Sequence, residues 1–157
     1  MNIKSILNYE PSTGLFTWVA RRGKVKANSI AGYVDKDGYV RIGVNYKQYY
    51  AHTLAWLYVY DSWPSLEIDH KNQIKNDNRI KNLRQVTRSE NSQNKQLQKN
   101  NSSGFRGVDW HKTNQKWRAK IKIKNQLYHR GYFDSIEDAA KAYQAASEKL
   151  HTHRPTP

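Results

Sequence analysis

A strongly polar stretch near residue 100 constrains the fold of this chain more than any other feature. Its twelve residues, 92–103, include a single apolar side chain. Such a segment cannot bury one face of a helix or strand, so it predicts the frayed end of a helix that runs into a linker. The sequence therefore predicts two small domains and a tail. Their expected boundaries are 1–98 for the first domain, 99–103 for the linker, 104–150 for the second domain and 151–157 for the tail.

The charge of the chain indicates a polyanionic partner. Its 157 residues include 27 Lys and Arg against 13 Asp and Glu, which gives a formal net charge of +14. Residues 71–99 contain eight basic and two acidic side chains, and residues 106–130 contain eight basic side chains and one acidic one. A basic chain that is also rich in aromatic residues most often binds nucleic acid. Ribosomal or membrane-surface binding stays open as an alternative.

Patterning and composition exclude several classes of protein. No apolar run approaches the roughly 18 residues that a membrane span needs. The first five residues lead into no apolar segment, so we expect no secretory signal and a cytoplasmic location. The chain has no cysteine, which excludes disulfide scaffolds, zinc sites with cysteine ligands and thiol nucleophiles.

Turn residues and alternating hydrophobicity predict a mixed N-terminal half. Asp-Gly at residues 37–38 is a hairpin turn, and the apolar residues after it recur at every second position. Leu54, Leu57 and Tyr58 instead recur at helical spacing. We therefore expect an α+β fold in which β-hairpins precede a helix. The predicted strands cover residues 15–18, 32–34 and 39–44, and the predicted helix covers residues 52–60.

The residues best suited to catalysis lie between positions 66 and 91. A short strand ends in Asp69 and His70, and a loop rich in asparagine and then a return strand follow it. Thr87 begins an S/T-x-x-E capping box, so a second helix starts there and carries Asn91 in its first turn. Two strands followed by a helix bring four polar side chains into one small volume: Asp69, His70, Asn82 and Asn91.

The spacing of these four residues resembles the HNH endonuclease motif. Asn82 lies twelve residues after His70, and Asn91 lies nine residues further on, which is similar to the His-Asn-Asn version of phage and intron-encoded homing endonucleases. The resemblance covers residues 8–95 and implies a ββα-metal nuclease domain. Local chemistry alone leaves open a surface turn whose asparagines bond their own backbone.

The resemblance implies a role for each residue of the motif. His70 is the expected general base, and its ordinary pKa suits proton transfer at neutral pH. Asp69 and the amide oxygen of Asn91 would bind one divalent ion, Mg²⁺ or Mn²⁺, because both are hard oxygen ligands. Asn82, expected to be essential for catalysis, braces the loop that carries the histidine. His52 stays open between a packed or capping residue and a residue near the active site.

Strict alternation predicts a small sheet in the C-terminal domain. Four apolar residues from Trp117 onward alternate with four basic residues that end at Lys124, so this segment is a strand with an apolar and a cationic face. Strands over 105–110 and 127–133 would complete an antiparallel sheet, and a helix capped by Ser135 would cover its apolar face. The basic face would then bind nucleic acid, although a merely solvated face stays open.

Residues 104–150 also resemble the Apetala-type (ethylene-response-factor) DNA-binding domain. The matching motifs are Gly104-Phe105-Arg106-Gly107-Val108, Lys116-Trp117, Gly131-Tyr132-Phe133 and Glu137-Asp138-Ala139-Ala140-Lys141-Ala142-Tyr143. In that family a three-stranded sheet enters the major groove of DNA. Asp109 and His129 differ from the residues of the plant domains, so no base preference follows. The expected DNA-binding residues are Arg106, Trp117, Arg118, Lys120, Lys122, Lys124, His129, Arg130 and Tyr143.

The two resemblances together imply a metal-dependent DNA endonuclease of the homing type. Residues 1–98 would hydrolyse a phosphodiester bond and nick one strand, and residues 104–150 would locate the site on double-stranded DNA. The chain offers a single set of catalytic residues and two unlike basic surfaces, which favours a monomer. A phage-encoded protein of this kind would act in the cytoplasm of an infected bacterium. The alternative is a non-catalytic, sequence-specific DNA-binding regulator in which the HNH part is only a scaffold.

Overall fold

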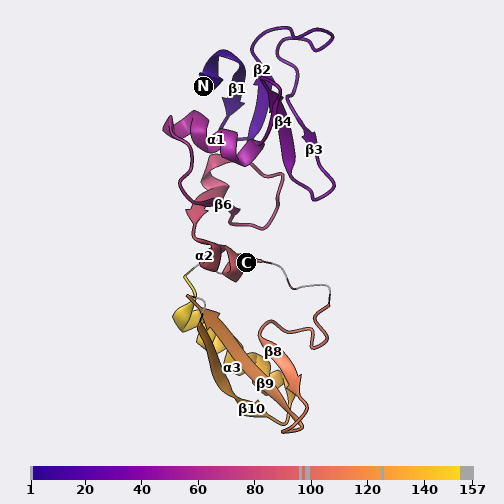
Figure 1. Ribbon diagram of the computed structural model, residues 1–157, viewed down its shortest axis with the longest axis vertical. Helices are drawn as coiled ribbons and strands as arrows, with labels where there is room; N and C mark the ends of the chain where they lie inside the picture. Colours follow the sequence, from indigo (N-terminus) through magenta and orange to yellow (C-terminus); the bar gives the residue numbers. More distant parts are fainter. Residues whose placement is uncertain (1, 96, 98–99, 125, 153–157) are drawn as a thin grey trace. The chain divides into compact units, whose positions relative to one another are not determined.

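The computed structural model describes residues 2–95, 97, 100–124 and 126–152 (Figure 1). Contacts divide the chain between Thr87 and Arg88 into a first unit and a second unit. Both units combine small antiparallel sheets with helices, so the predicted α+β class is confirmed. None of the helices in the described ranges is long and apolar enough to cross a membrane.

The first unit contains three small antiparallel sheets and one α-helix. Its sheets are the hairpin β1–β2, the three-stranded sheet β3–β4–β5 and the hairpin β6–β7. Short 3-10 helices cover Ile3–Ser5 and Ile80–Asn82. The other elements, in chain order, are β1 (Leu7–Glu10), β2 (Leu15–Trp18), β3 (Tyr33–Val34), β4 (Val40–Val44), β5 (Lys47–Tyr50), α1 (Ala51–Tyr60), β6 (Glu67–His70) and β7 (Leu83–Val86).

Helix α1 contributes much of the core of the first unit. Leu54 is fully buried on it and packs in one cluster with Leu7 and Phe16 of the first hairpin and Ile42 of β4. Full burial of a side chain of this size stabilises a fold by about 1.5–3 kcal/mol. The helix ends at Asp61, whose backbone is left-handed with φ 52°. Since α1 packs against the hairpins in one core, the helix has a fixed position relative to them. The side chains of its first turn, His52 among them, are therefore held in place as well.

The predicted strands and helix of the first unit are found within one residue of their expected ends, but β1 and β5 were not predicted. In β1 the buried Leu7 and Tyr9 alternate with two exposed residues, a pattern of only four residues. Strand β5 follows a tight turn at Asn45 and Tyr46, whose φ angles are 50° and 62°. Hairpin turns with two positive φ angles usually contain glycine, so this turn lacks the expected sequence signal.

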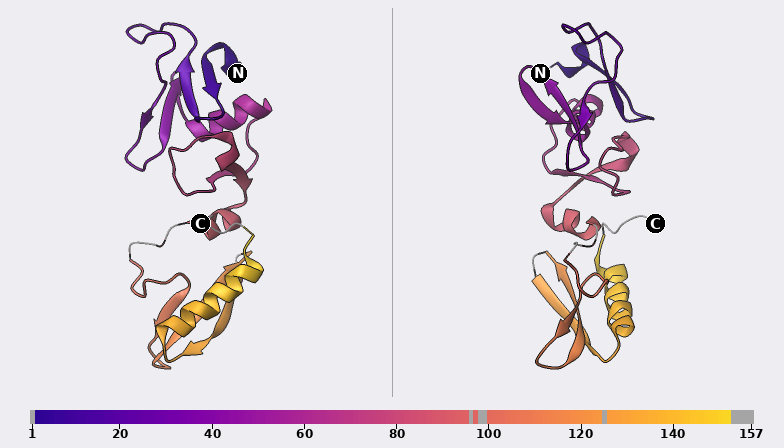
Figure 2. Two further views of the ribbon diagram at one scale, coloured as in Figure 1. Left: turned by 180° about the vertical axis from the view of Figure 1, so that it is seen from behind. Right: turned by 90° about the vertical axis from the view of Figure 1, so that its right-hand side faces the viewer.

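The second unit is a three-stranded antiparallel sheet with a helix across one face, preceded by a short helix (Figure 2). Val108, Ala119 and Ala139 form the buried centre between the sheet and the long helix. The Ser135 hydroxyl accepts a bond of 3.1 Å from the Asp138 backbone N–H, so the predicted N-cap is confirmed. The elements are α2 (Arg88–Asn94), β8 (Val108–His111), β9 (Lys116–Ile123), β10 (Gln126–Phe133) and α3 (Ile136–Leu150).

Strand β8 begins three residues later than predicted, and the other strand ends of the second unit differ from the prediction by at most one residue. Strand β8 begins at Val108 and not at residue 105, because Gly107 before it has a φ of +68° that no extended strand adopts. Strand β9 ends at Ile123, and Lys124 lies in the turn that follows, with a φ of 45°. The alternation of basic and apolar residues therefore continues one residue beyond the strand itself.

Two of the described hydrogen bonds connect helix α2 with other parts of the second unit. The Arg106 guanidinium donates a hydrogen bond of 2.5 Å to the backbone carbonyl of Gln93. The backbone N–H of Thr152 donates one of 3.1 Å to the side-chain oxygen of Gln93. The contact-based boundary at residues 87–88 therefore precedes the boundary that the polar segment suggests. The division into 1–98, 99–103, 104–150 and 151–157 stays a prediction.

Candidate active site

The hairpin of β6 and β7 carries two buried polar residues at the end of its first strand. Asp69 pairs with Arg84 and His70 pairs with Leu83 in the antiparallel register. Neighbouring side chains of a strand alternate in direction. Against the larger effect of burial, the charge of Asp69 nevertheless acts to raise the pKa of the His70 imidazole, so the two groups lie close together. Both are buried, with relative exposures of 7% and 5%. Buried polar groups require partners, and each of these residues has them.

His70 is held by an asparagine of the following loop. Its Nε2 atom lies 3.3 Å from the side-chain oxygen of Asn78, whose amide nitrogen donates to the backbone carbonyl of Asn76. The Asn78 oxygen is an acceptor, so this contact favours the tautomer with the proton on Nε2 and the lone pair on Nδ1. Burial lowers the pKa of His70 below its ordinary value, and the bond to Asn78 opposes this effect. The ring is therefore neutral at pH 7.

His52 lies beside His70, on the first turn of α1. The two rings meet edge to face with centroids 5.1 Å apart, and the ring of Tyr50 stacks on His52 at 5.1 Å. The Nδ1 atom of His52 is buried without a hydrogen-bond partner. Burial, and to a lesser extent His70, lowers the pKa of His52 to about 3. His52 is therefore a packed histidine that also lies beside His70. A role for it in the site stays a prediction.

Asp69 is bound by an arginine of the partner strand. The Nε and Nη2 atoms of Arg84 lie 2.9 Å and 2.8 Å from the same carboxylate oxygen, Oδ2. A carboxylate of this kind is a hard oxygen donor, which fits Mg²⁺ or Mn²⁺. The described part of the chain holds no group of three or more His, Cys, Asp and Glu side chains that could bind a metal. A divalent ion bound by one carboxylate and one amide oxygen does not need such a group.

The loop after His70 is folded around Asn82. The Asn82 side-chain oxygen accepts a bond of 3.1 Å from the Asn72 backbone N–H, and its nitrogen donates one of 2.8 Å to the Asp77 carbonyl. The two ends of the loop are therefore tied through one amide group. Bonds from Arg79, with a further bond from Asn72, lower the pKa of Asp77 to about 2. The loop is rigidly bonded around the position of the imidazole.

Three residues with contacts to the site were not singled out in the sequence. Asn78 is almost completely buried, and its backbone carbonyl accepts a bond of 2.7 Å from the Tyr9 hydroxyl. Asp77 and Arg84 support the loop and the carboxylate. The available sequence signals are weak: Asn78 and Asp77 lie in an asparagine-rich loop, and Arg84 lies in the predicted return strand. The bonding partners of these residues depend on the strand register, which the sequence does not give directly.

Asn91 lies on α2 and so belongs to the second unit. Its role as a metal ligand stays a prediction. Within the first unit, His52 of α1 lies next to His70. His70 and Asp69 belong to the same strand of the β6–β7 hairpin, and Asn82 is bonded to the loop that joins the two strands.

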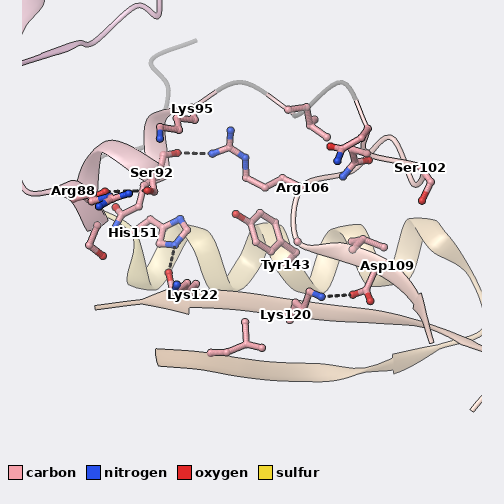
Figure 3. A pocket seen from close by; sticks show the side chains of 18 residues that line it. Arg88, Ser92, Lys95, Ser102, Arg106, Asp109, Lys120, Lys122, Tyr143 and His151 are labelled. Carbon is pink, nitrogen blue, oxygen red and sulfur yellow. Dashed lines mark hydrogen bonds and ion pairs between the residues drawn. The ribbon is translucent and has the colours of Figure 1, made fainter. Parts of the chain in front are cut away.

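The cationic face of the second unit is partly neutralised by an acidic residue. Asp109 of β8 accepts a bond of 2.6 Å from Arg118 of β9. It also forms an ion pair of 3.1 Å with Lys120 of the same strand (Figure 3). Burial raises the pKa of Asp109, but the bonds from Arg118 and Lys120 outweigh it and leave a net decrease. His129 pairs with Lys120 across the sheet, and Lys122 is exposed at the far end of β9.

The other predicted DNA-binding residues have different surroundings. Trp117 packs against the buried cluster under α3, on the face opposite to the basic residues of β9. Tyr143 lies against Gly107, and Arg106 reaches α2 (Figure 3). Arg130 lies at an irregularity in β10, with its guanidinium 5.7 Å from the ring centroid of Tyr128.

Comparisons with known proteins identify the family. The sequence model of the family described as HNH endonuclease matches residues 49–93, which include His52, Asp69, His70, Asn82 and Asn91. Protein 3.8 of Escherichia phage T7 is 30% identical over 112 residues, covering 68% of this chain and 92% of that protein. The chain belongs to the HNH endonuclease family. The nuclease part of the first resemblance is thereby confirmed, and the HNH motif is the one that carries the candidate site.

A solved structure provides a more distant match to this HNH endonuclease. The structure described as DNA binding and cleavage by the HNH homing endonuclease I-HmuI matches with 27% identity and a TM-score of 0.43. The match covers 55% of this chain and 49% of that chain, so this chain spans about half the length of that nuclease. The Apetala-type resemblance of residues 104–150 stays a prediction.

Proposed function

We propose that this HNH endonuclease is a metal-dependent, homing-type DNA nuclease that hydrolyses one phosphodiester bond and nicks one strand. The observation that carries the proposal is the buried imidazole of His70, held by Asn78 next to Asp69 in the matched segment. Hydrolysis of a phosphodiester needs a base for water, charge neutralisation and support for the leaving oxygen. Each requirement has a candidate group in this family motif.

His70 acts as the general base in this proposal. Its lowered pKa keeps the ring neutral at pH 7, so it can accept a proton from water without first losing one. The bond between Nε2 and Asn78 directs the basic lone pair to Nδ1. The edge contact with His52 restricts the ring further. The base is therefore both neutral and oriented before DNA binds, which lowers the entropy cost of the reaction.

Asp69 and Asn91 are the groups that would hold one divalent ion, Mg²⁺ or Mn²⁺. Such an ion supplies charge neutralisation at the scissile phosphate and at the leaving oxygen. Arg84 orients the Asp69 carboxylate through its Oδ2 atom. Asn82 acts indirectly, because it ties the two ends of the loop beside the base.

The second unit would locate the DNA site, as the Apetala-type resemblance implies. Among the predicted DNA-binding residues, Lys122, Lys124, His129 and Arg130 take part in none of the described ion pairs. Arg118 and Lys120 share Asp109, so DNA binding would have to compete with these ion pairs. We do not assign a direct DNA contact to Trp117, because it packs against the core of the unit.

Double-stranded DNA is the proposed partner, and a monomer is the proposed active species. The relation to a phage protein supports action in the cytoplasm of an infected bacterium. The proposal is tested by incubating supercoiled plasmid with the full chain and Mg²⁺, followed by the same reaction with EDTA. We expect conversion to the nicked circle with Mg²⁺ and no conversion with EDTA.

The variant that isolates the proposed base is His70→Ala. Loss of a general base typically costs about 10²–10⁴ in rate, whereas the affinity for DNA should change by no more than a few fold. His111→Ala is the matched control, since it removes a histidine from β8 outside the proposed site. Binding of DNA by a wild-type chain that never cuts would favour the regulator instead. Unchanged cleavage by His70→Ala would remove this residue from the mechanism.

A further inference from the structure

The loop between β2 and β3 carries a dense group of basic side chains in the first unit. Its residues 21–26, here named the basic loop, contain four basic side chains and no acidic one: Arg21, Arg22, Lys24 and Lys26. All four are exposed. None of them takes part in the ion pairs of the described residues. The motif-based function uses none of these residues.

The basic loop is folded and anchored. Arg22 and Val25 exchange two backbone hydrogen bonds of 3.0 Å across a turn that contains Gly23, whose φ is +59°. The chain on both sides is bonded to β2, since Trp18 accepts from Asn28 at 2.8 Å and donates to Ser29 at 3.1 Å. A loop held in this way loses little conformational freedom when it binds a partner.

One cation of the loop supports this arrangement. The guanidinium of Arg22 lies 4.6 Å from the ring centroid of Trp18, which is itself buried in β2. This cation–π contact stabilises the base of the loop. Arg21 donates through Nε to the Gly23 carbonyl, and its guanidinium has further donors. The loop forms the edge of the first unit in both views of the fold (Figures 1 and 2).

We propose that the basic loop binds the phosphate backbone of duplex DNA, as a contact surface separate from the sheet of the second unit. The proposal rests on the proposed function, because it assigns the loop to the same DNA substrate. Cations without acidic partners on a folded loop suit the evenly spaced charges of a phosphate backbone. Contacts to phosphate oxygens position a protein on DNA but carry no sequence information directly, so the loop would add affinity and not base specificity.

The test compares two full-length double variants that each lose two positive charges. Lys24→Gln/Lys26→Gln removes them from the basic loop, and Lys141→Gln/Lys149→Gln removes them from α3, outside every proposed DNA contact. Binding to a labelled duplex is measured over a series of salt concentrations, without a divalent ion. Each phosphate contact contributes about 0.9 to the slope of log affinity against log salt concentration on duplex DNA.

We expect the loop variant to bind more weakly and to lose up to about 1.8 from the slope, at about 0.9 per contact. The α3 variant should keep the slope of the wild type. Equal slopes for the two variants would overturn the proposal, as would a loop variant that binds like the wild type. Lys24→Glu/Lys26→Glu should weaken binding further, and an unchanged affinity of that variant would equally refute the contact.

The outcome is separable from that of the proposed function. Binding is measured without the ion that cleavage requires, so the slope does not depend on catalysis. A wild type that binds DNA but never nicks plasmid would contradict the nuclease proposal and leave the slope comparison valid. If the wild type nicked plasmid but the loop variant had the same salt slope as the wild type, the proposed loop contact would be refuted and the nuclease proposal would stand.

Discussion

At the scale of single residues, His52 is notable because it is buried as a neutral group beside a second histidine. Its pKa is lowered to about 3 in the folded chain, against an ordinary value of about 6.5 in the unfolded chain. As the pH falls below 6.5 the unfolded chain therefore binds more protons than the folded one. The stability that depends on neutral His52 is present above pH 6.5 and is lost as the pH falls toward 3.

This difference predicts the behaviour of His52→Phe, which keeps an aromatic ring and removes both nitrogens. We expect the free energy of unfolding of the variant to depend less steeply on pH between 6.5 and 4 than that of the wild type. Denaturant titrations at a series of pH values measure this slope. Parallel curves for His52→Phe and wild type would contradict the prediction.

The loop amide of Asn82 supports a second prediction. Asn82→Ala leaves the Asn72 backbone N–H and the Asp77 carbonyl without their partner, and an unsatisfied buried group costs about 1–3 kcal/mol. We expect a lower melting temperature together with a loss of plasmid nicking. Asn82→Asp keeps the acceptor for the Asn72 N–H but places a carboxylate oxygen against the Asp77 carbonyl, so its melting temperature should also fall below that of the wild type. A melting temperature of Asn82→Ala equal to that of the wild type would show that the amide does not brace the loop.

At the scale of elements, the start of β8 depends on a single glycine. A Cβ atom on Gly107 would lie 2.2 Å from a ring carbon of Tyr143 and 2.5 Å from the Lys120 carbonyl oxygen, at a φ of +68°. Gly107→Ala should therefore destabilise the second unit by more than about 2 kcal/mol and weaken DNA binding. Thermal unfolding and a binding titration measure the two effects.

Gly104→Ala is the matched control for this prediction. Gly104 has a similar φ of +74°, but no atom lies within 4 Å of the added Cβ. The control should lose only the conformational cost of about 1 kcal/mol. The difference between the two variants then measures the close approach of Tyr143. If both variants lost the same amount of unfolding free energy, packing against Tyr143 of α3 would not constrain this turn.

The elements also show which parts of the fold are predictable from sequence. Strand β9 is found almost as expected, because basic and apolar residues alternate over eight positions and one pattern explains them all. Strand β1 has four residues, too few to distinguish a strand from a loop. Strand β5 depends on a turn in which Tyr46 adopts a positive φ, a conformation that the residue type does not indicate.

The candidate site also contains residues that the sequence predicts and residues that it does not. Asp69, His70 and Asn82 were predictable because the spacing of a known motif places them. Asn78 and Arg84 were not, since their contacts follow from the register of β6 and β7 and from the path of the loop. Distances along the chain determine a motif, whereas the partners of its residues depend on the folded hairpin.

At the scale of the whole molecule, a single set of catalytic residues predicts one cut for each binding event. A symmetric dimer would present two equal sites, whereas this chain combines two basic surfaces of different construction. On a duplex labelled at one end of each strand, we expect breaks in one strand only, with a rate proportional to protein concentration. Simultaneous breaks in both strands, or a dimer in solution at nanomolar concentration, would contradict the prediction.

The attachment of α2 to the second unit bears on how related nucleases can be recombined. A chimera joined in the polar segment at residues 99–103 would separate Gln93 from Arg106 and Thr152, which both donate hydrogen bonds to it. A chimera joined between Thr87 and Arg88 would transplant the helix together with the groups that hold its end. The recipient would then acquire Asn91, the proposed metal ligand, together with the unit that we propose locates the DNA site. An exchange of target preference would therefore also exchange one residue of the proposed metal site.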